Sequence, residues 1–321
     1  MECPVGGRDY KMGNLRIGVL KGGISSEREI SLLSGKEVAN ALQRKGFLVK
    51  EIDITTSCKE KVKEMIFLHN IDVAFISLHG KFGEDGQIQR ILEEMRIPYT
   101  GSPPFANYLA MNKIASKKIF LKHKIPTANF FVLEKKDILP GKIKFPVVVK
   151  PYFSGSSIGV FIVYDEKELR KAVDEAFLWG EKVIIEDYIP GRELTVGILE
   201  EIPLEVIEII SFKDYFDFST KYSSDRVKFE VPARLEKDLY LKVQEIGVKA
   251  HRSLGCRHFS RVDIRLSKDN IPYVLEVNSI PGLTSHSLLP LGAKLKGIEF
   301  DDLVTRMVEL AIRDGKKEFF K

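Results

Sequence analysis

The sequence has few cysteines and no long apolar run. Its three cysteines, Cys3, Cys58 and Cys256, lie far apart, which excludes a disulfide framework and a cysteine-based zinc motif. The longest apolar stretches, such as Val73 to Leu78, have the length of a strand, well below the roughly 18 residues of a membrane helix. These absences predict a protein that resides in the reducing cytoplasm and does not bind a membrane.

The amino-terminal segment lacks the apolar centre of a signal peptide. Residues 1–14 contain Pro4, Gly6 and Gly7 and show no periodic apolar pattern. We therefore expect a disordered tail over 1–14, with ordered structure beginning after it.

The composition is that of a globular protein. Hydrophobic residues make up 44% and charged residues 30% of 321 residues, which excludes disordered and fibrous classes and predicts two or three domains. Lys and Arg exceed Asp and Glu by 50 to 45. An excess of +5 spread along the chain does not favour nucleic acid, although it suits small anionic ligands.

Strands and helices alternate over residues 15–104. Apolar strands are expected at Leu15 to Leu20, Phe47 to Ile54 and Ile71 to Leu78. Ser25 or Ser26 is expected to cap the first helix, which ends at Gly46. This alternation predicts an α/β domain with a doubly wound, Rossmann-like parallel sheet.

The rest of the chain has an α+β pattern. A helix from Phe105 to His123 is followed by strands in clusters that suggest antiparallel pairing, and we expect a central subdomain over 105–190 and a C-terminal one over 191–321. The stretch from Ser211 to Val231 is long and irregular. Such stretches usually have a function in compact domains, and we expect a lid loop over 211–231.

A lysine and a Gly/Ser-rich loop lie between two expected strands. Lys150 ends the first strand, and Ser154-Gly155-Ser156-Ser157-Ile158-Gly159 follows. Backbone N–H groups of such a turn, hydroxyls and an ammonium group suit phosphate oxygens. An ordinary hairpin loop is the alternative. The loop leads into a strand and has no GxxxxGK[ST] motif, which disfavours a P-loop kinase.

Polar residues alternate near the ends of the last two expected strands. Arg261 and Asp263 share one strand face, as do Glu276 and Asn278. The oxygens of Asp263, Glu276 and Asn278 suit Mg²⁺ with nucleotide phosphates. The alternative is a cross-strand ion pair on a solvated sheet face.

These motifs together resemble those of ATP-grasp ligases and, more narrowly, the D-alanine:D-alanine ligase family. The narrower resemblance adds Gly22-Gly23-Ile24-Ser25-Ser26-Glu27, Leu78-His79-Gly80, Lys221-Tyr222 and Asn278-Ser279-Ile280-Pro281-Gly282. The motifs occur in the same order from about Leu15 to the C-terminus. The resemblance implies an ATP-grasp fold that follows the N-terminal Rossmann-like domain along the chain. One departure is the bulky pair Tyr152-Phe153 before the loop.

The resemblance implies ATP and two Mg²⁺ ions, or Mn²⁺ in their place, as cofactors. The metal ligands are Asp263, Glu276 and Asn278. The residues implied for the nucleotide are Lys113, Lys150, Ser156 and Ser157 for the phosphates, Glu186, Asp187, Tyr188 and Ile189 for adenine, and Glu193 for ribose. Taken alone, Glu186 or Glu193 fits a solvent-facing glutamate.

The resemblance also implies D-alanine as substrate and a homodimer as the assembly. The implied substrate-binding residues are Glu27, His79, Arg261, Gly282, Ser287 and Leu288. The implied catalytic residues are Glu27, Ser156, Lys221, Tyr222 and Arg261. Taken alone, Glu27 fits an acidic first-turn residue favoured by the helix dipole, and His79 a structural histidine.

The implied reaction activates one D-alanine carboxylate as an acyl phosphate, which the amine of a second D-alanine attacks. The product is the dipeptide of bacterial cell-wall precursors. The alternatives are an ATP-grasp ligase for a different second substrate, D-lactate or D-serine, and a non-catalytic nucleotide-binding protein. A dehydrogenase is disfavoured because Gly18 to Gly23 does not form G-x-G-x-x-G.

Overall fold

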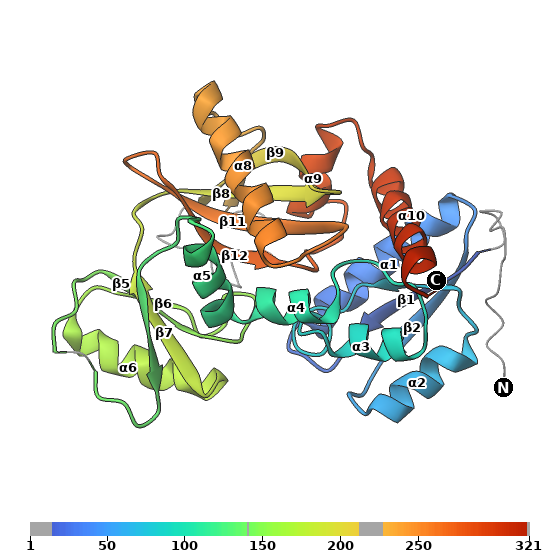
Figure 1. The fold of residues 1–321 in the computed structure, drawn as a ribbon, viewed down its shortest axis with the longest axis horizontal. Helices are drawn as coiled ribbons and strands as arrows, with labels where there is room; N and C mark the ends of the chain where they lie inside the picture. Colours follow the sequence, from blue (N-terminus) through green and yellow to red (C-terminus); the bar gives the residue numbers. More distant parts are fainter. Residues whose placement is uncertain (1–14, 140, 212–226, 320–321) are drawn as a thin grey trace. The chain divides into compact units, whose positions relative to one another are not determined.

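The computed structural model describes residues 15–139, 141–211 and 227–319 (Figure 1). The chain divides into two compact units, each made of separate chain segments. Unit 1 consists of Met1–Asn107, Cys256–Ser260 and Ser279–Lys321, and unit 2 of Tyr108–Gly255 and Arg261–Asn278. The C-terminal segment thus belongs to the same unit as the N-terminal one. The three-domain division stays a prediction.

Unit 1 is built on a parallel sheet with strand order β2-β1-β3. The strands are β1 (Arg16–Gly22), β2 (Leu48–Ile54) and β3 (Val73–Ile76). β1 pairs in parallel with both neighbours, and every residue of β3 is buried. Continuous apolar strands are typical of parallel sheets covered on both faces. The predicted α/β class of this part is confirmed.

Five helices lie wholly within the described part of unit 1. They are α1 (Arg28–Arg44), α2 (Lys59–Leu68), α3 (Gln87–Glu94), α9 (Leu288–Lys294) and α10 (Phe300–Phe319). Figure 1 shows α10 beside α1, where Arg44 donates two hydrogen bonds to Asp301. Ile280 lies in the same apolar core as Leu78, so the loop before α9 is anchored to this unit.

Unit 2 contains a four-stranded antiparallel sheet with order β4-β7-β5-β6. Its strands are β4 (Phe130–Glu134), β5 (Val147–Pro151), β6 (Phe161–Val163) and β7 (Lys182–Asp187). Helix α6 (Glu166–Ala176) packs against β5 and β6 and ends in a 3-10 turn, Phe177–Trp179.

A five-stranded sheet with order β10-β9-β8-β11-β12 forms the other sheet of unit 2. Its strands are β8 (Gly191–Leu199), β9 (Ile202–Ser211), β10 (Val227–Glu230), β11 (Phe259–Ser267) and β12 (Pro272–Asn278). Helix α8 (Lys237–Ser253) packs against β8, β9 and β12. The expected antiparallel pairing is confirmed for both sheets of unit 2.

Two helix predictions were wrong in detail. The expected helix from Phe105 to His123 is two helices, α4 (Pro104–Met111) and α5 (Lys113–Lys122). Asn112 between them is extended, and its side chain accepts a hydrogen bond from the N–H of Ala115, so it caps α5. Helix α1 begins at Arg28, after an N-cap at Glu27 without a side-chain cap, and not at Ser25 or Ser26.

The expected irregular stretch from Ser211 to Val231 contains a strand. Residues Val227–Glu230 form β10, which pairs antiparallel with β9. Ser211 is the last residue of β9, and Val231 follows β10. The other candidate lid residues, 212–226 with Lys221 and Tyr222, lie outside the described residues, as does the expected tail 1–14.

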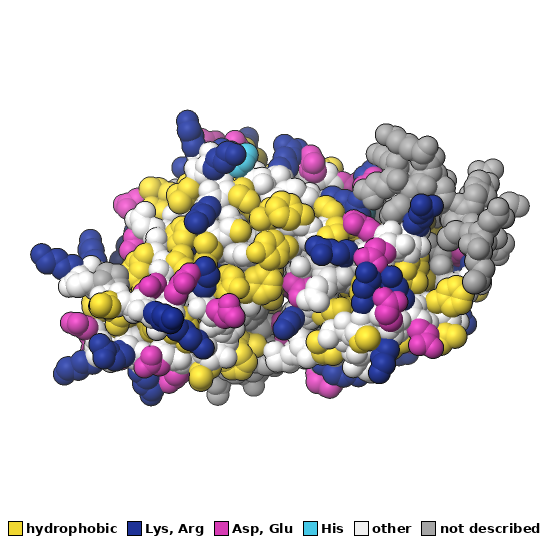
Figure 2. Space-filling view, turned by 60° about the horizontal axis from the view of Figure 1, so that its bottom comes forward, with side chains coloured by type: hydrophobic (Ala, Val, Ile, Leu, Met, Phe, Trp, Pro, Cys, Tyr) yellow, Lys and Arg dark blue, Asp and Glu magenta, His cyan; other side chains and the backbone are white. Residues whose placement is uncertain are grey.

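No helix in the described ranges is long and apolar enough to cross a membrane. On the face drawn in Figure 2, basic and acidic side chains of the described residues are interleaved. This interleaving agrees with the dispersed charge that the sequence indicates.

Candidate active site

Strands β11 and β12 bring the predicted metal ligands together. In their antiparallel register Asp263 lies opposite Glu276, and Arg261 lies opposite Asn278. The intervening residues Val262 and Val277 are buried on the other face. The predicted face is therefore present, with two carboxylates, one amide and one guanidinium on neighbouring strands.

Cationic side chains neutralise both carboxylates of this face. Arg261 donates from Nε and one Nη to the two oxygens of Asp263 at 2.9 and 2.7 Å, and Thr195 on β8 donates to Asp263 at 2.7 Å. Lys113 Nζ lies 2.9 Å from Glu276 Oε2. In the part of the chain that the structure describes, no group of three or more His, Cys, Asp or Glu could hold a metal ion. A site here therefore needs the amide oxygen of Asn278 as its third protein ligand.

Lys113 also joins this face to the Gly/Ser-rich loop. Its Nζ donates to the carbonyl of Ser154 at 2.6 Å, and its backbone N–H donates to the carbonyl of Tyr152 at 2.9 Å. Its side chain is 8% exposed. The start of α5 thus places one ammonium group against both the loop and Glu276.

The loop after β5 has the backbone expected of an anion-binding turn. Ser156, Ser157 and Gly159 have φ values of 51°, 56° and 72°. Left-handed residues in a turn direct successive N–H groups toward one side, where they suit anionic oxygens. A Cβ at Gly159 would lie 2.8 Å from a carbon of the Trp179 ring, so this position has no space for a side chain.

Aromatic rings flank the start of this loop. The ring centroids of Tyr152 and Phe153 are 5.6 Å apart, and those of Phe153 and Tyr108 are 5.8 Å apart. Tilted contacts at this separation are favourable. The bulky pair that departs from the family pattern thus forms part of a small aromatic cluster.

Lys150 belongs to a buried cluster of three charges. Its Nζ donates to Glu186 Oε1 at 2.5 Å, and Lys117 Nζ lies 2.8 Å from Glu186 Oε2. Burial lowers the pKa of Lys117, although Glu186 opposes this shift. Burial alone would raise the pKa of Glu186, but the ammonium groups of Lys150 and Lys117 outweigh it, so the pKa is lowered. The cluster is therefore a carboxylate shared by two lysines.

Arg265 on β11 holds the segment predicted to bind the adenosine part of ATP. Its guanidinium donates to the carbonyl of Ile189, the hydroxyl of Tyr188 and the carboxylate of Glu193, each at 3.2 Å. Asp187 is exposed and accepts a hydrogen bond from Asn129. Tyr188, Ile189 and Glu193 are thus brought together by one cation.

In unit 1, Glu27 and His79 lie in one cluster. A Cβ at Gly80, where φ is 70°, would lie 2.4 Å from Glu27 Oε2, so the carboxylate rests directly on this glycine. Ser25 accepts a hydrogen bond from the N–H of Glu27 and donates one to the carbonyl of His79. The His79 ring is 5% exposed and lies 3.4 Å from a carboxylate oxygen of Glu84. The two predicted contacts of the first substrate are thus neighbours.

The other predicted substrate residues of unit 1 form a tight turn before α9. A Cβ at Gly282 would lie 3.1 Å from Ser287 Oγ. Ser287 accepts a hydrogen bond from the N–H of Thr284 at 3.0 Å and precedes Leu288, the first residue of α9. Gly282, Ser287 and Leu288 are therefore close together.

The sequence reasoning missed three residues of this site. Lys117 lies one helical turn after Lys113, so the i, i+4 spacing could have indicated it. Arg265 continues the alternation of Arg261 and Asp263 along β11. Thr195 on β8 contacts Asp263 only through tertiary pairing, and no sequence pattern indicates it.

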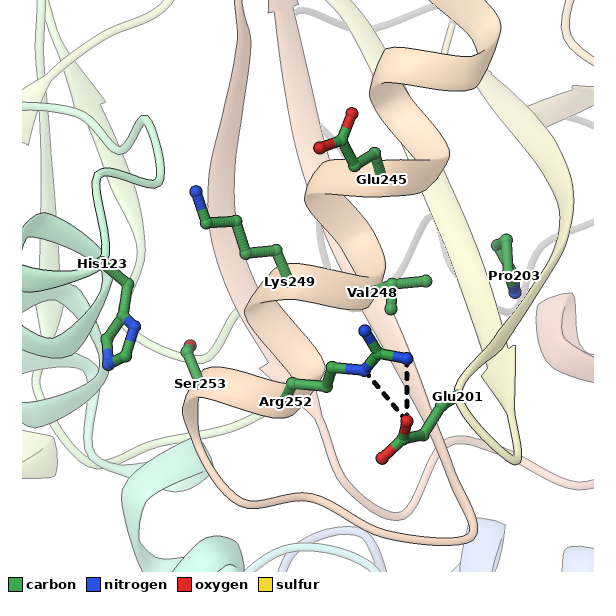
Figure 3. Close-up of a pocket in the computed structure, with 8 residues that line it drawn as sticks. All are labelled: His123, Glu201, Pro203, Glu245, Val248, Lys249, Arg252 and Ser253. Atoms are coloured by element: carbon green, nitrogen blue, oxygen red, sulfur yellow. Dashed lines mark hydrogen bonds and ion pairs between the residues drawn. The ribbon is translucent and has the colours of Figure 1, made fainter.

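One pocket of the described chain lies apart from all of these residues. It is lined by His123, Glu201, Pro203, Glu245, Val248, Lys249, Arg252 and Ser253 and has a volume of about 510 Å³. Figure 3 shows Arg252 turned toward Glu201, with which it forms an ion pair at 2.8 Å. None of the predicted site residues lines this pocket, so its volume does not identify the active site.

Comparison with protein families gives two matches. Residues 56–102 match the family model of the D-ala D-ala ligase N-terminus, and residues 119–309 match that of the C-terminus. The D-alanine–D-alanine ligase of Geotalea uraniireducens is 44% identical over 299 residues, covering 92% of this chain and 95% of that protein. The D-alanine–D-alanine ligase of Pelotomaculum thermopropionicum is 40% identical over 314 residues, covering 94% and 98%.

Solved structures agree with these matches. The D-alanine–D-alanine ligase of Bacillus anthracis complexed with ATP is 35% identical, with a TM-score of 0.83 and coverage of 95% of this chain and 99% of that one. The D-Ala:D-Ser ligase VanG of Enterococcus faecalis is 28% identical, with a TM-score of 0.79 and coverage of 93% and 99%.

Proposed function

Because this chain belongs to the D-alanine–D-alanine ligase family, we propose that its two units divide the work of joining two D-alanines with ATP. The chain is an ATP-dependent ligase, and its product is the dipeptide for cell-wall synthesis. Unit 2 provides the residues for the nucleotide, and unit 1 provides those for the first D-alanine. The observation that carries this division has two parts. The loop with left-handed backbone at Ser156 and Ser157 lies beside Lys113. The oxygen face, by which we mean the face of β11 and β12 that carries Asp263, Glu276 and Asn278, lies in the same unit.

Lys150, Ser156 and Ser157 bind the phosphates of ATP in this proposal, together with Lys113. Left-handed backbone at Ser156 and Ser157 suits anionic oxygens, and both lysines lie next to the loop or its preceding strand. The segment from Glu186 to Ile189 receives adenine, and Glu193 receives the ribose hydroxyls. The Glu186 side chain itself is buried against two lysines, so the backbone of Tyr188 and Ile189 is the better candidate for the base.

The chemistry of the donor set fits Mg²⁺. Asp263, Glu276 and Asn278 would hold the ion, because hard carboxylate and amide oxygens are the ligands that Mg²⁺ prefers. When bound, the two Mg²⁺ ions would neutralise phosphate charge and polarise the transferred phosphoryl group. Arg261 pairs with Asp263 and Lys113 with Glu276, so each of the two carboxylates has a cationic partner.

Glu27 binds the ammonium group of the first D-alanine, and His79 lies beside it. The carboxylate of that D-alanine attacks the γ-phosphorus of ATP, and ADP leaves with the electron pair of the broken P–O bond. The amine of the second D-alanine then attacks the acyl carbon, a proton is lost, and inorganic phosphate leaves. Arg261 stabilises the developing oxyanion, while Gly282, Ser287 and Leu288 hold the second substrate. Ser156, Lys221 and Tyr222 are proposed to complete the catalytic group.

A comparison of single variants tests the nucleotide half of this proposal. Lys150→Met is expected to weaken ATP binding by at least roughly tenfold and D-alanine binding by less than about twofold, because the lost charge faces phosphate. Lys171→Met on the exposed face of α6 is the matched control. Calorimetry that shows equal losses for the two ligands would remove Lys150 from the phosphate site.

A phosphate-release assay tests the substrate class. We expect release with ATP, Mg²⁺ and D-alanine, and none with L-alanine. The rates with D-serine and D-lactate as second substrates measure the selectivity of the enzyme for D-alanine. A rate with either of them that exceeds the rate with D-alanine would contradict the assignment.

We further propose a homodimer in the cytoplasm, as the family resemblance implies. Leu33, Phe67 and Leu68 on α1 and α2 are more than half exposed, which gives unit 1 apolar surface. Light scattering at micromolar concentration tests the assembly, and a mass of one chain would exclude the dimer.

A further inference from the structure

Lys117 is a fully buried lysine that the reaction described above does not use. None of its side chain is exposed, and its Nζ donates to Thr127 Oγ1 at 2.6 Å and lies 2.8 Å from Glu186. Thr127 in turn donates to the carbonyl of Val274 at 2.9 Å, which fixes the hydroxyl. The position of the ammonium group is therefore set from two sides.

The charges around Lys117 do not cancel. Lys117 and Lys150 carry two positive charges, and Glu186 between them carries one negative charge, so the cluster has a net charge of +1. Asp187 is the other acidic group that acts on Lys117, but it is exposed and bonded to Asn129, where water screens it. Burying an uncompensated charge costs free energy of desolvation, and an anion bound beside it offsets that cost.

We propose that Lys117 is a positioning residue that keeps Lys150 available for the phosphates of ATP. This inference rests on the proposed role of Lys150. Lys150 contacts one oxygen of Glu186 and Lys117 contacts the other. Without Lys117, Lys150 and Glu186 form a neutral pair that attracts phosphate weakly. With it, the cluster keeps one positive charge for the ligand.

Binding of ATP and of adenosine to the full chain separates this role from a purely structural one. Lys117→Met is expected to weaken ATP binding roughly tenfold or more, because one charge near the phosphates is lost, and to change adenosine binding by less than about twofold. KM for ATP should rise while KM for D-alanine stays unchanged. Lys118→Met is the matched control, since Lys118 is the next residue and is exposed.

A second pair of variants keeps the test valid if Lys117→Met does not fold. Glu186→Gln and Lys117→Met/Glu186→Gln differ only by the charge of Lys117, and neither leaves a buried glutamate with a single partner. Relative to Glu186→Gln, the double variant should lose ATP affinity and retain adenosine affinity, because one positive charge near the phosphates is removed. In a folded Lys117→Met chain, adding Glu186→Gln restores the net charge and should recover part of the ATP affinity.

The outcomes are distinguishable. Unchanged ATP binding in Lys117→Met, or equal loss of ATP and adenosine, overturns the inference while Lys150→Met still weakens ATP binding. If Lys150→Met also leaves ATP binding unchanged, the proposed phosphate role of Lys150 fails as well.

Discussion

His258 gives unit 1 a stability that we expect to depend on pH. The ring is 4% exposed, and its Nδ1 accepts a hydrogen bond from the N–H of Gly101 at 3.1 Å. Because an N–H donates to Nδ1, the proton is on Nε2, which lies 3.0 Å from the Asp314 carboxylate. Protonating Nδ1 would break the bond to Gly101. Burial, helped by the nearby charge of Arg257, lowers the pKa of His258 to about 4, although Asp314 opposes the shift.

The sign and size of the effect follow from linkage. In the unfolded chain His258 has the ordinary histidine pKa of 6.5, whereas in the folded chain its pKa is about 4. The unfolded state therefore binds the proton first, and the free energy of unfolding decreases as the pH falls from 6.5 toward 4. Each unit of pKa difference is worth about 1.4 kcal/mol, so the whole window is worth about 3 kcal/mol. Between about pH 7 and about pH 5 the loss is about 2 kcal/mol. Buried His251 belongs to unit 2, and its pKa, also lowered to about 4 by burial, adds a similar amount to the pH dependence of the whole chain.

Urea unfolding at several pH values measures this loss. His258→Asn is the suitable variant because φ at this position is 61°, which asparagine tolerates. The variant should keep only the part of the pH dependence due to His251, whereas His123→Asn at an exposed position should keep all of it. In the unmodified chain, burial alone would raise the pKa of Asp314, but its bonds to His258 and Arg313 lower it, so Asp314 titrates below its ordinary value of 3.8 and outside the pH window of His258. An unchanged pH dependence in His258→Asn would refute the reasoning.

Other predictions concern the site. Glu276→Gln should lower turnover by more than roughly tenfold with the fold intact, since Mg²⁺ would lose a charged ligand, and turnover nearer to that of the unmodified chain would remove Glu276 from the metal site. Arg265→Met should weaken ATP and adenosine alike by roughly tenfold, because it releases Tyr188, Ile189 and Glu193, and Arg265→Lys should recover little; calorimetry with unchanged adenosine affinity would contradict this. From the sequence, Tyr222→Phe should gain ester formation with D-lactate, most at low pH where the competing amine is protonated, and mass spectrometry that finds an unchanged product ratio would exclude this role.

Local periodicity was sufficient to predict the oxygen face. Residues two apart share a strand face, so the pairs in Arg261-Val262-Asp263 and Glu276-Val277-Asn278 could be placed before the structure was known. The antiparallel register confirmed that the polar faces of β11 and β12 lie on the same side of the sheet, with Asp263 opposite Glu276. The strands of the parallel sheet in unit 1 and the change to antiparallel pairing were likewise predicted from apolar patterns, whereas β10 was not, because its residues lie in the stretch expected to be irregular.

Features that depend on distant segments were not predicted. Helix α10 has buried residues at helical spacing, such as Leu303, Met307 and Leu310, but its packing on α1 joins opposite ends of the chain. The burial of Lys117 likewise depends on Glu186, which lies far along the chain on another element. Sequence patterns indicate which face of an element is polar, whereas the partner of that face is decided by tertiary packing.

The close approach of Gly159 to Trp179 makes the Gly/Ser-rich loop, which is proposed to bind phosphate, visible to fluorescence. The chain has a single tryptophan, and its ring lies where a side chain on Gly159 would be. Indole emission changes with the surroundings of the ring, so we expect ATP binding at this loop to alter the emission without any label. Adenosine, which has no phosphates, is expected to leave the emission unchanged. Stopped-flow mixing of the unmodified enzyme with nucleotide can therefore time the loop separately from the chemistry that follows.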